Sequence, residues 1–306
     1  MPVRIVFMGT PEFARAPLER LYRDGHDIAG VFTQPDKPVN RGMKVACGPV
    51  KELALSRHTP VFQPKTLRDG AAADVLRGLE CELIAVVAYG KILPRKILGI
   101  PPLGAVNIHG SLLPKYRGAA PIQWAVLNGE TETGVTSMLM AEELDAGDIL
   151  YAKKTAIGED ETAGQLYSRL SALGAELLSE TVGAISSGAA VHIAQDHSQA
   201  TFAPPLTKDM APIDWNGTAR SIKCKVQGLD PWPVATTELN GTVCKVYRVE
   251  TGDNRAGKAP GSIVSSGRHG IEVACADGTV IIKELQAPGG KRMASADYLR
   301  GHEIIV

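Results

Sequence analysis

The chain has 306 residues, a formal net charge of zero, and a composition of 44% hydrophobic and 22% charged residues. This length predicts two domains of ordinary globular composition. Zero net charge argues against a nucleic-acid binder that works by bulk charge, although it leaves room for a local basic patch. The apolar runs have the length of strands and are too short to cross a bilayer.

The beginning of the chain enters an expected strand directly, so we predict no targeting segment. The five cysteines are scattered, odd in number and without a CxxC pair. This pattern predicts free thiols rather than a zinc ribbon or a disulfide framework. Free thiols are typical of a reducing compartment, and we therefore expect a cytoplasmic protein.

The first part of the chain alternates between expected strands and helices. Thr10 is the expected N-cap of the first helix, with Pro11 in its first position. Strands separated by helices predict an α/β fold, a parallel sheet with helices on both faces, and such sheets bind ligands at the carboxyl ends of their strands. We expect strands at residues 3–9, 27–33, 60–62, 82–89 and 104–110, and helices at 11–24, from about 50, and before 82.

The pattern changes from residue 133 onward. Strands are expected at residues 136–140 and 149–153, and a helix follows from Thr162, where Gln165 completes a capping box. Regular patterning fades near residues 188–206, and hairpin signals follow at residues 240–241 and 276–278. We therefore predict a first domain over residues 1–190, a linker over 191–206, and a small β-barrel or sandwich domain over 207–306.

The strand expected at residues 104–110 ends in two polar side chains. Alternation places Asn107 and His109 on the same face. An amide can donate to a developing oxyanion, and a histidine can transfer protons. A single histidine in a strand is more often structural, but Gly110 permits close approach of a ligand. Further on, Asp145 lies in a tight glycine turn and would complete an Asn/His/Asp set.

Other chemistries fit these residues less well. A hydrolase built on Ser111, His109 and Asp145 lacks the GxSxG elbow. A metal site of His109, Asp145 and Asp148 lacks ligand spacing. A dinucleotide site at the first strand–helix turn is disfavoured, because this turn does not match GxGxxG and Glu12 would repel a pyrophosphate. Acyl-group transfer without a covalent nucleophile is the remaining hypothesis.

Several motifs together resemble the signature of folate-dependent formyltransferases. They are NIHGSLLP at 107–114, RGAAPI at 117–122, GVT at 134–136 and LDAGD at 144–148, with shorter pieces at 7–13, 34–38, 86–90, 213–215 and 231–233. The resemblance implies a Rossmann-like formyltransferase domain followed by an OB-like β-barrel, with 10-formyltetrahydrofolate as cosubstrate and no metal. It also implies Asn107, His109 and Asp145 as the catalytic set. The folate pocket would include Ser111, Leu112, Leu113 and Pro114, and Tyr89 and Gly90 would shape it, with strand termination as the alternative role for those two.

The acceptor is inferred from a long basic loop. Residues 35–50 hold Lys37, Arg41 and Lys44 against the single acid Asp36, and an RNA end offers a row of phosphates to such a loop. The loop resembles the tRNA-acceptor loop of the family, with Arg41 at its arginine position. We therefore predict formyl transfer to the α-amino group of initiator methionyl-tRNA by a monomer whose C-terminal domain also binds tRNA.

Three alternatives to a tRNA-directed enzyme were weighed. A sugar-amine formyltransferase with the same folate donor is the stronger rival. Glycinamide ribonucleotide formyltransferases resemble the chain less, because the Gly/Asn/Ser-rich phosphate cradle is missing from its first turn. A folate- or RNA-binding module without activity is disfavoured because Asn107, His109 and Asp145 are all present.

Overall fold

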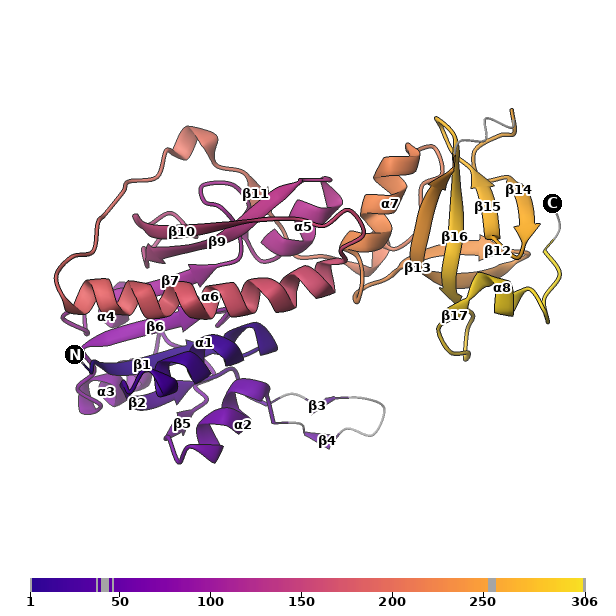
Figure 1. Cartoon of the computed structure of the whole chain (residues 1–306). Helices are drawn as coiled ribbons and strands as arrows, with labels where there is room; N and C mark the ends of the chain where they lie inside the picture. Colours follow the sequence, from indigo (N-terminus) through magenta and orange to yellow (C-terminus); the bar gives the residue numbers. More distant parts are fainter. Residues whose placement is uncertain (1, 37, 40–43, 46, 253–256, 305–306) are drawn as a thin grey trace. The chain divides into compact units, whose positions relative to one another are not determined.

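The computed structural model describes residues 2–36, 38–39, 44–45, 47–252 and 257–304 (Figure 1). The chain forms two compact units. The first comprises residues up to Pro121, Glu132–Ala156 and Tyr167–Ala203, and the second comprises Ile122–Thr131, Ile157–Leu166 and the chain from Pro204 onward. The predicted domain bounds stay predictions.

The first unit is built on a seven-stranded sheet with the strand order β10-β9-β7-β6-β1-β2-β5. The five strands from β7 to β5 in this order run parallel, whereas β9 is antiparallel to both of its neighbours, β7 and β10. The predicted α/β fold with a Rossmann-like sheet is confirmed. The strands are β1 (Arg4–Gly9), β2 (Asp27–Phe32), β5 (Val61–Phe62), β6 (Leu83–Val87), β7 (Ala105–His109), β9 (Glu132–Leu139) and β10 (Ile149–Ala156).

Helices cover both faces of this sheet (Figure 1). On one face, alternate side chains of β1 and β6 join a core cluster with α3 (Ala71–Gly78) and α4 (Arg95–Leu98). On the other face, α6 (Ala163–Ser186) lies close to β7 and β9, because the Thr181 hydroxyl donates to Ser137 over 2.9 Å. The strands β1, β2 and β6 are therefore buried on both faces, as their continuous apolar sequences predict. The remaining helices of this unit are α1 (Glu12–Arg23) and α2 (Pro49–Ser56), whereas all but the first residue of α5 (Pro121–Leu127) belongs to the second unit.

The start of α1 differs from the prediction. Its N-cap is Pro11, without a side-chain cap, so the assignment of Thr10 as N-cap is wrong. The Thr10 hydroxyl instead accepts a hydrogen bond from the backbone N–H of Gln34 over 3.1 Å, which ties the first strand–helix turn to the chain after β2. The capping box before α6 is confirmed, because the backbone N–H of Thr162 donates to Gln165 Oε1 over 2.9 Å.

Short elements complete the first unit. β3 (Pro38–Val39) pairs with β4 (Lys44–Val45), and β8 (Arg117–Gly118) pairs in parallel with β11 (Phe202–Ala203). The 3₁₀ turn His197–Gln199 precedes β11. Part of the segment 191–206, expected to be a linker, thus pairs with the chain that follows the motif at residues 107–114.

Within the described residues, no helix combines the length and apolar character needed to cross a membrane.

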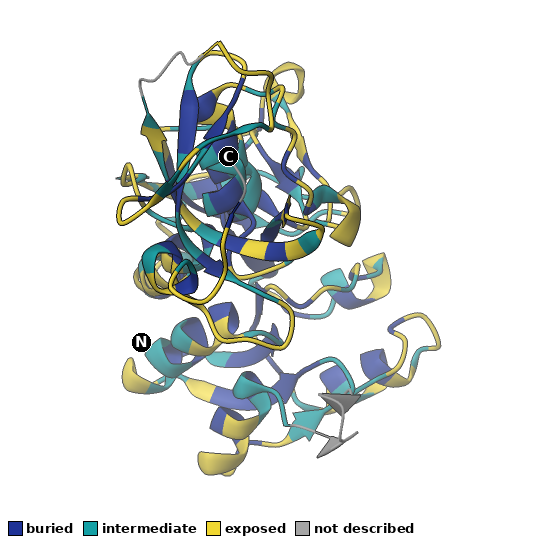
Figure 2. Cartoon of the chain, turned by 90° about the vertical axis from the view of Figure 1, so that its right-hand side faces the viewer, coloured by how far each residue is buried: buried dark blue, intermediate teal, exposed yellow. Residues whose placement is uncertain are grey.

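The second unit is a small antiparallel β domain, as predicted. Its sheet has the order β12-β13-β16-β15-β14, with β17 paired to β16. Asn240 and Gly241 turn the first hairpin with φ of +47° and +76°, which is type I′ geometry. Exposed and buried residues alternate over residues 243–246 of β13. Figure 2 colours the chain by the burial of each residue. The elements are α7 (Ala219–Gly228), the 3₁₀ turn Lys208–Met210, β12 (Ala235–Leu239), β13 (Thr242–Gly252), β14 (Ile263–Gly267), β15 (Gly270–Ala274), β16 (Thr279–Gln286), β17 (Met293–Ala294) and α8 (Ser295–Tyr298).

Candidate active site

The polar pair Asn107 and His109 lies at the carboxyl end of β7, between β6 and β9 in the sheet. Both side chains are buried, with 8% and 6% of their surfaces exposed. A strand held on both sides by hydrogen-bonded neighbours is a rigid support for reacting groups. The predicted placement of these two residues at a strand end is confirmed.

His109 has a defined contact at each ring nitrogen. Its Nε2 lies 2.8 Å from the carbonyl oxygen of Tyr116. A carbonyl only accepts, so Nε2 carries a proton, and Nδ1 is the nitrogen that faces Asp145 Oδ2 over 3.7 Å. In the neutral ring Nδ1 holds a lone pair, which cannot bond directly to a carboxylate. At this distance the two groups form an ion pair only when a second proton is bound at Nδ1.

Asp145 occupies the turn between β9 and β10 with φ of +50°, in the left-handed region that Asp tolerates better than most residues. Its Oδ2 accepts a hydrogen bond from the backbone N–H of Gly118 over 2.8 Å. The turn lies against β9 so closely that a Cβ at Gly147 would stand 1.9 Å from the carbonyl oxygen of Leu139. The carboxylate is thus held both by its own backbone and by Gly118, in the chain after the motif at residues 107–114.

Two side chains of the predicted folate wall support the loop itself. The Ser111 hydroxyl donates to the carbonyl of Lys115 over 2.6 Å, and Leu113 is buried. Leu112 and Pro114 are only partly buried, and they are the members of the set with surface to offer a ligand. The loop is joined to β9 by the hydroxyl of Thr136, which donates to the Ser111 carbonyl and accepts from the Leu113 N–H. Contact of these residues with folate stays a prediction.

Tyr89 and Gly90 follow β6. Tyr89 is 1% exposed and belongs to the core cluster beside α3 and α4. This burial raises the pKa of its hydroxyl to about 12. Gly90 has φ of +75°, and the carbonyls of both residues accept hydrogen bonds from Gln34 Nε2 over 3.0 and 3.4 Å. Their predicted part in the pocket remains to be tested.

The base of the basic loop is a compact polar cluster that we call the loop clamp: Gln34, Asp36, Lys51 and Gln63. Lys51 pairs with Asp36, and Gln63 Nε2 donates to Asp36 Oδ1 and to the Gln34 carbonyl, each over 2.9 Å. The hydrogen bond from Lys51, and to a smaller extent that from Gln63, holds the pKa of Asp36 below its ordinary value. Of the predicted tRNA contacts, Lys37 and Arg41 lie outside the described residues, and of Lys44 only the backbone in β4 is described.

No group of three or more His, Cys, Asp or Glu in the described part of the chain is placed to hold a metal ion.

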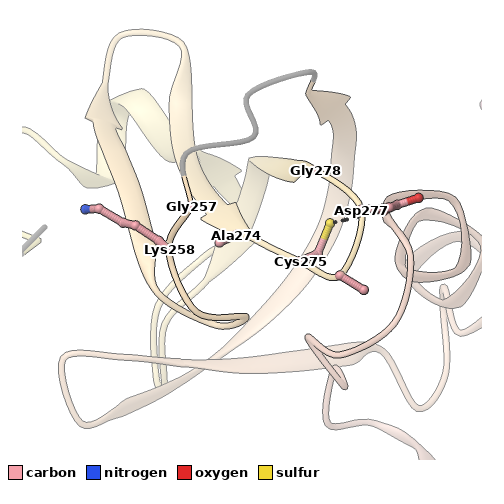
Figure 3. Close-up of a pocket in the computed structure, with 7 residues that line it drawn as sticks. Gly257, Lys258, Ala274, Cys275, Asp277 and Gly278 are labelled. Atoms are coloured by element: carbon pink, nitrogen blue, oxygen red, sulfur yellow. Dashed lines mark hydrogen bonds between the residues drawn. The ribbon is translucent and has the colours of Figure 1, made fainter.

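The second unit has a pocket beside residues 274–278 (Figure 3). Cys275 and Asp277 face each other there, with Sγ donating to Oδ1 over 3.6 Å, while Lys258 points away from them. The same Asp277 oxygen accepts from the N–H of Ala219 over 2.7 Å, so it caps α7.

Comparison with known proteins identifies the family. The formyl transferase family model matches residues 3–182, and the formyl transferase C-terminal domain model matches residues 205–303. The chain belongs to the formyl transferase family. Solved structures share the fold at low identity: an N-formyltransferase from Helicobacter canadensis, in complex with folinic acid and dTDP-3-aminofucose, has a TM-score of 0.68 at 17% identity and covers 95% of this chain and 100% of its own.

The curated relatives define the position of the chain within that family. The methionyl-tRNA formyltransferase of Trichlorobacter lovleyi is 50% identical over 98% of this chain and 95% of its own length. That of Alkaliphilus oremlandii is 47% identical over 99% and 97%. At this identity and coverage the chain groups with the methionyl-tRNA formyltransferases.

The structure also brings to the site groups that sequence reasoning missed. These are the carbonyl of Tyr116, the N–H of Gly118 and the side chain of Gln195, whose Nε2 donates to the carbonyls of Asp145 and Gly147 over 2.9 and 2.7 Å. The first two are backbone atoms, and Gln195 lies in the segment 191–206, where no pattern marks it. Only the fold shows their proximity.

The assigned tautomer of His109 can be checked directly. Because Nε2 donates to the Tyr116 carbonyl, we expect the neutral ring to be protonated at Nε2 and not at Nδ1. Long-range ¹H–¹⁵N NMR spectra of the protein labelled with ¹⁵N-histidine, recorded at a pH where the ring is neutral, distinguish the two forms. His109→Gln assigns the signal, and a ring protonated at Nδ1 would contradict the arrangement.

Proposed function

We propose that this chain transfers the formyl group of 10-formyltetrahydrofolate to the α-amino group of methionyl-initiator tRNA, giving formylmethionyl-tRNA for translation initiation. The observation that carries the proposal is the buried His109–Asp145 pair at the end of β7, on the same strand face as Asn107. The relatives named methionyl-tRNA formyltransferase, similar over nearly the whole chain, support the choice of acceptor. We place the enzyme in the cytoplasm as a monomer, in keeping with its free cysteines.

The residues fit the charges that this reaction creates. As the methionyl amine adds to the formyl carbon, the carbonyl oxygen gains negative charge and the nitrogen gains positive charge. The amide of Asn107 donates to the oxyanion, and such a donor contributes about 100- to 1,000-fold in kcat. Asp145 and Nδ1 of His109 take the proton that leaves the attacking nitrogen, because Nε2 is engaged by the Tyr116 carbonyl. When the intermediate collapses, the bond between the formyl carbon and the folate nitrogen breaks, and that nitrogen leaves with the proton.

The donor side of the site fits a flat, uncharged ring. Leu112 and Pro114 are the partly exposed members of the loop after β7, and neither carries a charge. Ser111 and Leu113 are turned into the loop and hold its shape. We infer that the donor is recognised by shape and apolar contact with Leu112 and Pro114, and that Gly90 bounds the pocket after β6.

The acceptor side is assigned to the basic loop. Lys37, Arg41 and Lys44 would contact phosphates near the end of the tRNA, while the loop clamp holds both ends of the loop to the first unit. The C-terminal domain is proposed as a second tRNA contact. The sugar-amine alternative is less favoured, because a protein crystallised with an amino-sugar nucleotide shares only 17% identity with this chain.

The acceptor is tested by supplying the purified protein with 10-formyltetrahydrofolate and one of two amines. We expect formylation of methionyl-initiator tRNA and none of a nucleotide-linked amino sugar, measured by mass spectrometry of the products. Formylation of the sugar together with an unchanged tRNA would overturn the proposed function in favour of the alternative.

The catalytic set is tested by His109→Ala, Asn107→Ala and Asp145→Ala. Each variant should lower kcat by a factor of about 100 or more while folate and tRNA binding are retained, because the lost contacts form in the transition state. The combined loss should be less than the product of the three, because the residues act as one unit. Near-normal turnover of Asp145→Ala would make this acid structural, and Asp148 would then be tested.

The basic loop is tested by Arg41→Ala, with the exposed Arg68 replaced in the same way as a control. Arg41→Ala should raise KM for methionyl-tRNA and leave KM for the folate donor unchanged. Part of the difference in KM between the variant and the wild type should disappear at high salt, because the release of counterions from the RNA then contributes less to binding. A defect in folate affinity alone would assign the loop to the donor site.

A further inference from the structure

A buried arginine lies directly beside the candidate site. Arg117, in β8, is 2% exposed. Its Nε and Nη2 donate to Gln195 Oε1 over 3.2 and 2.7 Å, and two guanidinium nitrogens lie 3.4 and 3.3 Å from His197 Nδ1. Among the residues that the structure describes, no carboxylate pairs with it. A buried charge is costly unless it is well bonded, so this arginine calls for an explanation.

The contact with Arg117 fixes the direction of the Gln195 amide. A guanidinium only donates, so the oxygen of Gln195 must face it and the nitrogen must face the other way. On that side Nε2 donates to the carbonyl of Asp145 over 2.9 Å and to that of Gly147 over 2.7 Å. Gln195 is 6% exposed, so these hydrogen bonds are shielded from water. Both ends of the Asp145–Gly147 turn are thereby held by one side chain.

The segment that carries Gln195 is itself anchored. Ile193 exchanges two backbone hydrogen bonds with Ile149, at the start of β10, over 2.8 and 2.9 Å. On the opposite side, the N–H of Arg117 donates to the carbonyl of Thr201 over 2.8 Å. The chain before the 3₁₀ turn His197–Gln199 is therefore bonded to the edge strand β10, and the chain after it is bonded to β8. Gln195 lies between these two anchored points.

We propose that Arg117 and Gln195 are positioning residues for Asp145. Arg117 holds Gln195 in one orientation, Gln195 holds the left-handed turn, and the turn aims the carboxylate at Nδ1 of His109. The inference rests on the proposed function, since it takes Asp145 as part of the catalytic set. It assigns a role to a buried charge and a buried amide that the reaction chemistry above does not use.

The test replaces the donor nitrogen of Gln195 while keeping the size of the side chain. Gln195→Glu leaves an oxygen for Arg117 and gives that arginine a carboxylate partner, but it turns a second oxygen toward the carbonyls of Asp145 and Gly147. We expect kcat to fall about 10- to 100-fold, the effect of a small displacement of a reacting group. KM for both substrates should stay unchanged. The melting temperature should change little, because the new ion pair with Arg117 offsets the loss of the donor to the two carbonyls.

Two controls separate positioning from general damage. Gln199→Glu makes the same change in charge at an exposed site four residues away and should behave as the wild type. In the Asp145→Ala background, Gln195→Glu should change kcat by less than about twofold, because a residue that acts through Asp145 has nothing left to position. Gln195→Met, of similar size and without polar atoms, repeats the test should Gln195→Glu fail to fold.

The result that overturns the inference is a Gln195→Glu variant with wild-type kcat, or an equal loss of kcat in the presence and absence of the Asp145 carboxylate. Failure of the proposed function is a separate outcome. If the wild type formylates an amino sugar and not methionyl-tRNA, the same kcat ratios are measured with the sugar, and they decide the role of Gln195 independently of the acceptor.

Discussion

The hydrogen bond between His109 Nε2 and the carbonyl of Tyr116 is the constraint on which the rest of the site depends. It fixes the tautomer of a buried ring and leaves Nδ1 as the nitrogen that meets Asp145. The next but one residue, Gly118, donates to the Asp145 carboxylate. The stretch 116–118 therefore contacts both His109 and Asp145, and a shift of this stretch would change both contacts.

This arrangement is rigid because β7 is a central strand and the Asp145 turn is bonded to both Gly118 and Gln195. β7 lies between hydrogen-bonded strands, and α6 covers the face opposite to α3 and α4. Water is largely excluded from Asn107 and His109, which strengthens each polar contact that they make. The same exclusion makes unsatisfied groups costly, so the carbonyls of the Asp145 turn need the donor that Gln195 supplies.

Sequence patterns predicted much of this molecule because local rules determine it. Apolar runs predicted the strands of the first sheet, Thr162 and Gln165 formed their capping box, and Asn240-Gly241 turned its hairpin. The set of Asn107, His109 and Asp145 was expected from residue types and the family resemblance, and its geometry needed the fold. Gln195 was not predicted at all, since a polar residue in an irregular segment carries no periodic signal. The prediction of Thr10 as N-cap was wrong because its hydroxyl accepts a hydrogen bond from the backbone N–H of Gln34 and not from an N–H of the helix.

The loop clamp isolates the basic loop from the rest of the first unit. Asp36 and Lys51 close the base of the basic loop, while Gln34 is bonded to the turn after β6. Because the ends are joined beneath the loop, its length and charge can vary at little cost in closure entropy and without strain on the turn after β6. The loop is in this sense an independent insertion: a different sequence between residues 36 and 47 is expected to leave the strand order of the sheet unaltered.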